Sequence, residues 1–111
     1  MTLHKMRLQS EPFEKIKSGT KRIELRLFDE KRKLINIGDT IEFQKQSEET
    51  EMLHVKVVAL LRYRSFSELF DDFVPEIFGG KDKISLLEGV HQFYSPEREK
   101  EYGVLGIRIE K

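Results

Sequence analysis

The chain has 111 residues, with 20 Lys and Arg against 20 Asp and Glu, so its net charge is zero. A chain of this length can bury one adequate hydrophobic core, and we expect a single domain over residues 1–111. Because a neutral protein has no overall field that holds a polyanion, tight binding of nucleic acid without regard to sequence is disfavoured.

The charges are divided unevenly along the chain. Residues 1–45 hold eleven Lys and Arg and seven Asp and Glu, whereas residues 46–111 hold nine and thirteen. The two parts therefore carry +4 and −4. If the protein has a local basic face, we expect the N-terminal part to provide it.

Composition excludes several classes of site. The absence of cysteine removes disulfides, thiolate nucleophiles and thiolate metal ligands. The three histidines are far apart in the sequence, so we expect no metal site, and nothing in the sequence indicates a cofactor. The chain has no run of about 18 apolar residues and no apolar N-terminal leader, so we expect a cytoplasmic protein that does not span a membrane.

The N-terminal third predicts a strand, a short helix and a second strand. Residues 3–8 alternate loosely between apolar and polar, which is typical of a strand. Pro12 suits the first turn of a helix, and Gly19 suits its end because glycine tolerates the left-handed conformation there. A strand follows over residues 21–28, and the charged residues 29–36 form a connection.

Two further strands are predicted in the middle of the chain. A Gly-Asp turn at residues 38–39 leads into a strand over residues 41–43, and the polar residues 44–50 predict a loop. The next strand, residues 52–61, shows the clearest alternation, and more apolar residues near its end indicate that both faces become covered. Its apolar face consists of Leu53, Val55, Val57, Ala59 and Leu61.

The C-terminal half predicts two helices and a closing strand. Ser65 and Glu68 form a capping box that begins a short helix, and two glycines at residues 79–80 interrupt the chain. Apolar residues three to four apart predict a second helix over residues 84–94, and the last strand covers residues 103–110. We therefore expect an α+β fold, a small β-barrel of about five to six strands with short helices inserted between strands.

Residues 19–26 place a lysine, a glutamate and an arginine around the start of the second predicted strand. Side chains on one face of a strand recur at every second residue, so Glu24 and Arg26 should project side by side. The spacing alone favours an ion pair along the edge of a sheet. A partly desolvated Lys21 would instead have its ammonium form disfavoured, and could act as a base or nucleophile.

The same residues fit the pattern G-x-K-x-x-E-x-R, from Gly19 to Arg26. This pattern resembles the signature of the ASCH (activating signal cointegrator homology) domain, a family of small PUA-like β-barrels. The resemblance extends to segments on both sides of the motif and to the C-terminus: residues 4–8, 12–17, 29–32, 37–43 and 102–109. From residue 44 to residue 96 the chain is similar to the family only in pattern.

The resemblance implies a cleft that receives RNA or a nucleoside-like ligand. Carried over by position, the residues that line it are Gly19, Lys21, Glu24 and Arg26. Arg26 offers a planar set of donors to a phosphate or a base carbonyl, and Glu24 would accept from an exocyclic amine such as that of cytosine. An aromatic side chain would stack on the base. We predict Tyr63, which is flanked by two arginines, for this role, with Phe28 as the alternative. We therefore predict a protein that binds RNA or a modified nucleoside.

The resemblance also implies enzymatic alternatives at the same residues. Activities ascribed to the family include hydrolysis of the amide of N4-acetylcytidine and cleavage of RNA. In either reaction Lys21 would activate the attack and Glu24 would move the proton. The amidohydrolase pattern has a threonine in place of Glu24 and a further carboxylate from the central region, for which Glu68 and Glu76 are the candidates here. A regulatory role through a protein partner is a third alternative, and the sequence does not define the oligomeric state.

Overall fold

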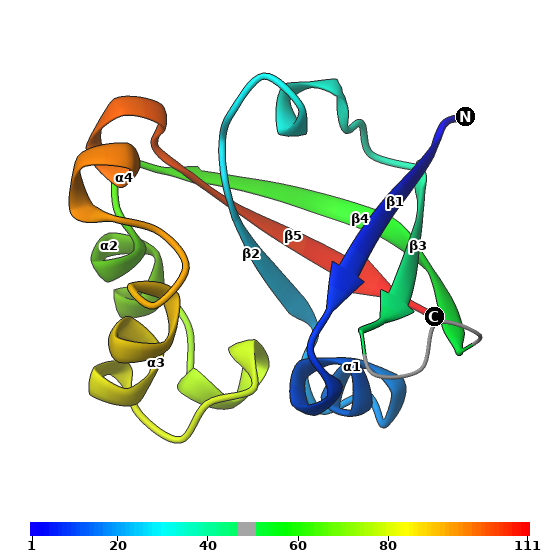
Figure 1. Ribbon diagram of the computed structural model, residues 1–111, viewed down its shortest axis with the longest axis horizontal. Helices are drawn as coiled ribbons and strands as arrows, with labels where there is room; N and C mark the ends of the chain where they lie inside the picture. The colour runs from blue at the N-terminus through cyan, green and yellow to red at the C-terminus, as the bar shows by residue number, and fades with distance from the viewer. Residues whose placement is uncertain (47–50) are drawn as a thin grey trace.

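Five strands form one mixed sheet that curls into a half-barrel (Figure 1). The computed structural model describes residues 1–46 and 51–111. The strands are β1 (Leu3–Leu8), β2 (Ile23–Leu27), β3 (Thr40–Lys45), β4 (Met52–Tyr63) and β5 (Val104–Glu110). Their order is β1-β3-β4-β5-β2, with β1 and β3 parallel and the other neighbours antiparallel. The expected α+β fold is confirmed, and β1 and β2 are the two edges of an open half-barrel.

Helix α1 (Ser10–Lys17) closes one end of the half-barrel (Figure 1). Phe13 and Ile16 lie three residues apart on one helical face and are 0 and 1% exposed. They pack in the first core, together with the inward side chains of β1, β3, β4 and β5. Gly19 follows the helix with a φ of +85°, which glycine adopts without strain. The predicted helix and its glycine stop are both confirmed.

Strand β4 contacts two cores, and an irregularity between Val57 and Ala59 changes which side chains face each of them. Before it, Val55 and Val57 are buried in the first core. After it, Leu60 contacts that core while Leu61 contacts the second. The prediction that Ala59 and Leu61 continue the face of Val55 and Val57 is therefore wrong, because an extra residue in a strand shifts the alternation to the other face.

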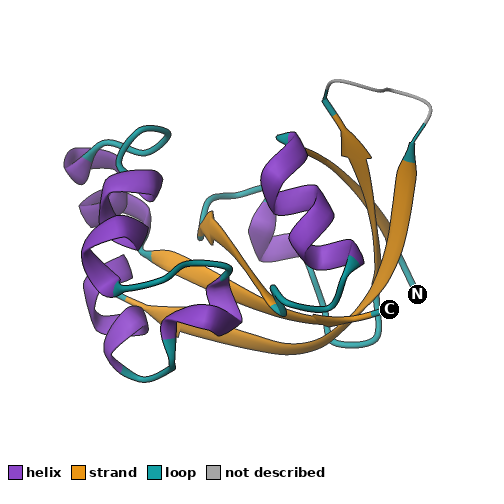
Figure 2. Cartoon of the chain, turned by 90° about the horizontal axis from the view of Figure 1, so that it is seen from below, coloured by secondary structure: helices purple, strands orange, loops and turns teal. Residues whose placement is uncertain are grey.

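The segment between β4 and β5 forms a helical layer beside the sheet (Figure 2). It contains α2 (Phe66–Asp71), the 3-10 helix η2 (Pro75–Phe78), α3 (Lys83–Val90) and α4 (Pro96–Tyr102). The predicted start of this helix is confirmed, since Oγ of Ser65 caps α2 by accepting a hydrogen bond from the N–H of Glu68 at 3.1 Å. The second core joins this layer to the sheet, and includes Ile23, Leu27, Phe66, Leu69, Phe70, Phe78 and Val104.

The second predicted helix is shorter than expected, and α4 was missed. Helix α3 ends at Val90, and residues 91–94 form a turn before a separate helix begins at Pro96. Ser95 caps that helix by accepting from the N–H of Arg98 at 3.2 Å. The buried residue of α4 is Glu99, so the helix has no apolar stripe from which periodicity could reveal it.

The connection from β2 to β3 contains the 3-10 helix η1 (Arg32–Leu34) and is anchored by Asp39. This carboxylate accepts from the N–H groups of Asn36 at 2.9 Å and Thr2 at 3.2 Å, and lies 2.8 Å from Nε2 of His4. The bonds to His4, Asn36 and Thr2 lower the pKa of Asp39 to about 2. The predicted turn at residues 38–39 is confirmed, and it also fixes the N-terminal strand.

The loop predicted over residues 44–50 begins later than expected, because β3 extends to Lys45. Its residues 47–50 lie outside the described residues. Within residues 1–46 and 51–111, no helix has the length and apolar character that crossing a membrane requires.

Candidate functional site

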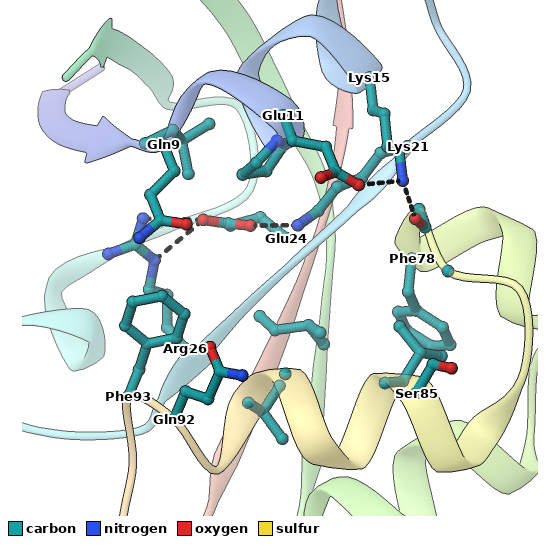
Figure 3. Close-up of a pocket in the computed structure, with 18 of the residues that line it drawn as sticks. Gln9, Glu11, Lys15, Lys21, Glu24, Arg26, Phe78, Ser85, Gln92 and Phe93 are labelled. Carbon is teal, nitrogen blue, oxygen red and sulfur yellow. Dashed lines mark hydrogen bonds and ion pairs between the residues drawn. The ribbon is translucent and has the colours of Figure 1, made fainter. Parts of the chain in front are cut away.

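Three polar side chains of the motif meet beside β2 (Figure 3). Glu24 lies between the two cations: its Oε1 is 2.9 Å from Nζ of Lys21, and its Oε2 accepts from Nε and Nη2 of Arg26 at 3.0 and 2.7 Å. Glu24 and Arg26 are two residues apart on the strand and share a face, as the spacing predicts. We call Lys21, Glu24 and Arg26 the motif triad.

The motif triad is largely removed from water, with the side chains of Lys21, Glu24 and Arg26 10, 4 and 14% exposed. Burial alone would raise the pKa of Glu24, but the charges of Lys21 and Arg26 outweigh it and lower the pKa to about 2. Burial alone would lower the pKa of Arg26, but the charge of Glu24 outweighs it and the pKa is raised. Glu24 and Arg26 are therefore both ionised at neutral pH.

Backbone hydrogen bonds on both sides position Lys21. Its N–H donates to the carbonyl of Lys15 at 3.0 Å, at the end of α1. The N–H of Arg22 donates to the carbonyl of Ile77 at 2.8 Å, in η2. The residues before β2 are thus held between α1 and η2, which directs the Lys21 side chain towards Glu24.

Arg26 also joins the two edges of the half-barrel. Its Nη2 donates to the backbone carbonyl of Arg7, on β1, at 3.3 Å. Because β1 and β2 are the edge strands and are not paired with each other, this bond bridges the open side of the sheet. The triad therefore lies where the half-barrel is open.

The triad lines a cleft of about 930 Å³, which we call the motif cleft. The end of β1 and the start of α1 form one wall, and α3 with the residues after it forms the other, with Glu24 between them (Figure 3). Five cations and three carboxylates line it, so a neutral protein presents a concave surface with excess positive charge. The cations are Arg7, Lys15, Lys21, Arg26 and Lys81, and the carboxylates are Glu11, Glu24 and Glu76.

A contact between α1 and the residues after η2 closes one end of the motif cleft. Nζ of Lys15 donates to the carbonyl of Gly79 at 2.6 Å and to Oε1 of Glu11 at 3.0 Å. Gly79 has a φ of +84°, and a Cβ there would lie 3.2 Å from Cδ of Lys21. A glycine is needed both for this backbone conformation and for the close approach. The chain break predicted at residues 79–80 is confirmed.

Two aromatic residues line the wall opposite α1. Phe93 is 59% exposed, and it lies across the cleft from Gln9 in Figure 3. Its neighbour Tyr94 also lines the cleft, and burial raises the pKa of its hydroxyl. Phe93 lies outside the apolar spacing that predicted the helix, so the sequence pattern did not indicate it as a site residue. The available signal was an aromatic residue off that spacing, shortly before the Ser-Pro pair that caps the next helix.

Two predicted ligand-binding residues lie elsewhere. Tyr63 does not line the motif cleft: its hydroxyl donates to Oδ2 of Asp72 at 2.5 Å, and the side chain packs against the second core. Gly19 does not line the cleft either, although it ends the helix that forms one wall. The alternative aromatic, Phe28, lies beneath the guanidinium of Arg62, 4.0 Å from its ring centroid. Of the five predicted ligand-binding residues, those that line the motif cleft are thus the three of the motif triad.

The two carboxylates considered for an amidohydrolase are separated by the fold. Glu76 lines the motif cleft, whereas Glu68 lies on α2 and pairs with the exposed Arg64 at 3.6 Å. In the described part of the chain, no group of three or more His, Asp and Glu side chains is arranged to hold a metal ion.

Comparison of the chain with models of known protein families assigns it to one of them. The model of the ASCH domain matches residues 6–111. The chain belongs to the ASCH domain family. A crystal structure of the hypothetical protein PH0355 is 41% identical, covers 98% of each chain and has a TM-score of 0.87. The solution NMR structure of protein PF0455 from Pyrococcus furiosus is 37% identical, covers 98% of this chain and 96% of that one, and has a TM-score of 0.75. No curated protein matches the chain at a significant level.

Proposed function

We propose that the motif cleft of this ASCH domain binds one nucleotide unit of RNA, or a free modified nucleoside of the same chemistry. The observation that carries the proposal is the motif triad, because two cations held by one buried carboxylate line a cleft with excess positive charge. The family assignment supports it, since ASCH domains generally bind RNA. The cleft volume of about 930 Å³ falls in the range of small-molecule sites, roughly 300–1,000 Å³.

Lys21 and Arg26 are the donors of the proposed site. Arg26 suits a phosphate or a base carbonyl because its guanidinium is planar and always charged, and Lys21 adds a second positive charge. Glu24 is only 4% exposed beneath them, so its main role is to hold both cationic groups in place. The site is pre-organised, which reduces the entropic cost of binding.

Phe93 is the proposed stacking residue. It is exposed on the cleft wall without filling the core, and base stacking on aromatic side chains contributes about 1–3 kcal/mol per base. Tyr63, which the sequence favoured for this role, is engaged with Asp72 outside the cleft. We therefore assign stacking to Phe93.

Hydrolysis is the competing use of the same residues, and the charge state of Glu24 argues against it. A general base works best when its pKa is near the operating pH, whereas the pKa of Glu24 is about 2. The position of Glu76 in the cleft is the observation that fits an amidohydrolase. On balance the geometry supports binding.

The test is calorimetric titration with cytidine monophosphate and with short single-stranded RNA at a fixed salt concentration. The Arg26→Lys variant keeps the charge and loses the planar donor set, and we expect its affinity to fall about tenfold. The matched control is Arg22→Lys, because Arg22 is exposed four residues away and does not line the cleft. Equal affinities for both variants and the wild type would rule out this site. Incubation with N4-acetylcytidine, followed by chromatography for cytidine, tests the hydrolase alternative.

A further inference from the structure

A second, smaller depression adjoins β1 and has no assigned role. Its volume is about 270 Å³, and it is lined by residues 3–6 of β1 and by Lys31, Arg32, Leu34 and Ile35 of the connection from β2 to β3. We call it the η1 depression, after the 3-10 helix that forms one side. None of its lining residues is acidic. His4 already pairs with the buried Asp39, so the available positive charge comes from Lys5, Lys31 and Arg32.

Arg32 lacks full compensation for its charge. Its side chain is 14% exposed, and its nearest carboxylate oxygen, Oδ2 of Asp29, is 3.9 Å from Nη1. Among the residues that the structure describes, Nε of Arg32 is the buried side-chain nitrogen without a hydrogen-bond partner. Burial lowers the pKa of Arg32, and the like charge of Arg26 lowers it further. An anion in this depression would supply the missing negative charge.

Lys5 and Lys31 add positive charge at the surface of the same depression. Both side chains are exposed, and neither makes a hydrogen bond or an ion pair to residues in the ranges 1–46 and 51–111. In the motif cleft, by contrast, Lys15 and Lys21 are paired with Glu11 and Glu24. The η1 depression therefore has two surface cations available to a ligand.

The η1 depression and the motif cleft are consecutive along one edge strand. Residues 3–6 of β1 line the depression, and residues 7–9 line the motif cleft. Lys5 and Arg7 are two residues apart and both exposed, so they share a face of the strand about 6.5–7 Å apart. The positive charge of Arg26 in the cleft also lowers the pKa of Arg32 in the depression. Lys5 in the depression and Arg7 in the cleft thus place positive charge in both hollows along β1.

We propose that the η1 depression holds a backbone phosphate of a single-stranded RNA whose neighbouring nucleotide occupies the motif cleft. This inference rests on the proposed function and extends it, because it makes an RNA strand the ligand rather than a free nucleoside. The depression is smaller than the roughly 300–1,000 Å³ of typical ligand pockets, and no Phe, Tyr or Trp lines it. Its size and charge fit a phosphate, and it offers no aromatic platform for a second base.

Salt-dependent binding tests the proposal. The protein is titrated into a labelled single-stranded RNA of about ten nucleotides, within the range that small barrels cover, at several salt concentrations. The variant combines Lys5→Ala with Lys31→Ala, and the matched control combines Lys56→Ala with Lys100→Ala, two exposed lysines outside both hollows.

Each phosphate contact on a single strand contributes about 0.7 to the slope of log affinity against log salt. Because the depression holds one phosphate, we expect the slope of the Lys5 and Lys31 variant to fall by about 0.7 and its RNA affinity to fall about tenfold at moderate salt. Its affinity for cytidine monophosphate should stay within about twofold of the wild type, because one nucleotide does not reach the depression.

The outcomes separate this inference from the proposed function. If the Lys5 and Lys31 variant binds RNA like the control while Arg26→Lys loses affinity, the η1 depression holds no phosphate and the motif cleft is retained. If the wild type binds neither the RNA nor cytidine monophosphate, both proposals fail. The single variants Lys5→Ala and Lys31→Ala should each reduce the slope by less than about 0.7, because both lysines serve the same phosphate, and a fall of about 1.4 in the double variant would contradict a site for one phosphate.

Discussion

Oε2 of Glu24 accepts two hydrogen bonds from Arg26, one from Nε at 3.0 Å and one from Nη2 at 2.7 Å. The same Nη2 donates to the carbonyl of Arg7 on the opposite edge strand. One guanidinium thus joins the buried carboxylate of the motif to the open side of the half-barrel. This relationship makes the motif triad part of the fold as well as part of the proposed site.

Replacing Glu24 by glutamine should therefore destabilise the fold. Glu24→Gln leaves Lys21 and Arg26 largely buried without a counter-charge, which typically costs about 3–5 kcal/mol. We expect the free energy of unfolding in urea to fall by about 3 kcal/mol. The control is Glu30→Gln, because Glu30 is 87% exposed in its pair with Lys33 and should change stability by less than about 1 kcal/mol. Equal, small losses for both variants would show that the buried pairing has no role in stability.

Acid should destabilise the protein through Glu24 and Asp39. Both pKa values are lowered in the folded state to about 2, from ordinary values of 4.5 and 3.8. A lowered folded-state pKa contributes stability that is complete above the unfolded pKa and is lost as the pH falls towards the folded one. We expect the free energy of unfolding to decrease between about pH 4.5 and pH 2. In Asp39→Asn, the decrease should be smaller and the stability at pH 7 lower, whereas an unchanged pH profile would contradict this role.

The turn after η2 should accept no side chain at Gly80. A Cβ at Gly80 would lie 2.5 Å from Cδ2 and 2.7 Å from Cγ of Leu86, which is closer than packed atoms allow. We expect Gly80→Ala to lower the free energy of unfolding by about 1–3 kcal/mol and to disturb the wall of the cleft formed by α3. Gly89→Ala is the matched control, since a Cβ there meets nothing within 4 Å and alanine favours the helix by about 0.5–1 kcal/mol. We expect Gly80→Ala to lower the thermal midpoint and Gly89→Ala to raise it. Changes of the same sign in both variants would contradict the packing at Gly80.

Phe93 should matter for ligand binding and little for folding. Phe93→Ala removes a side chain that is 59% exposed, so the thermal midpoint should change little, while the affinity for a base-bearing ligand should fall about tenfold. Tyr63→Phe removes only the hydroxyl that binds Asp72 and should leave affinity unchanged. The reverse pattern, with Tyr63→Phe weakening binding and Phe93→Ala neutral, would move the site away from the motif cleft.

Local sequence patterns predicted the elements that depend on residues close together in the sequence. The spacing of Phe13 and Ile16 before Gly19 located α1, and the period of two placed Glu24 beside Arg26 on β2. The polar helix α4 gave no apolar period, and the irregularity at Val57 in β4 gave no signal that separates it from continued alternation. These misses arise because tertiary contacts decide both features.

The candidate site could be predicted in part for the same reason. All three residues of the motif triad fall within six positions, so a sequence pattern captures them. Phe93 belongs to the opposite wall and Gly79 to one end of the cleft, each more than 50 residues from the motif, and only the packing of the helical layer brings them to the cleft. Tyr63 has an aromatic ring that suits stacking, but the fold places it outside the cleft, where its hydroxyl donates to Asp72.

The most direct test of the central claim is the pattern of amide chemical-shift changes when the isotope-labelled protein is titrated with short single-stranded RNA. We expect saturable changes at Lys21, Glu24, Leu25 and Arg26 of the motif and on the opposite wall, because these residues line the motif cleft. The residues of the opposite wall are Gln92, Phe93 and Tyr94. Saturable changes confined to other surfaces, or no saturable changes with RNA or cytidine monophosphate, would contradict the claim that the motif triad forms a nucleotide-binding site.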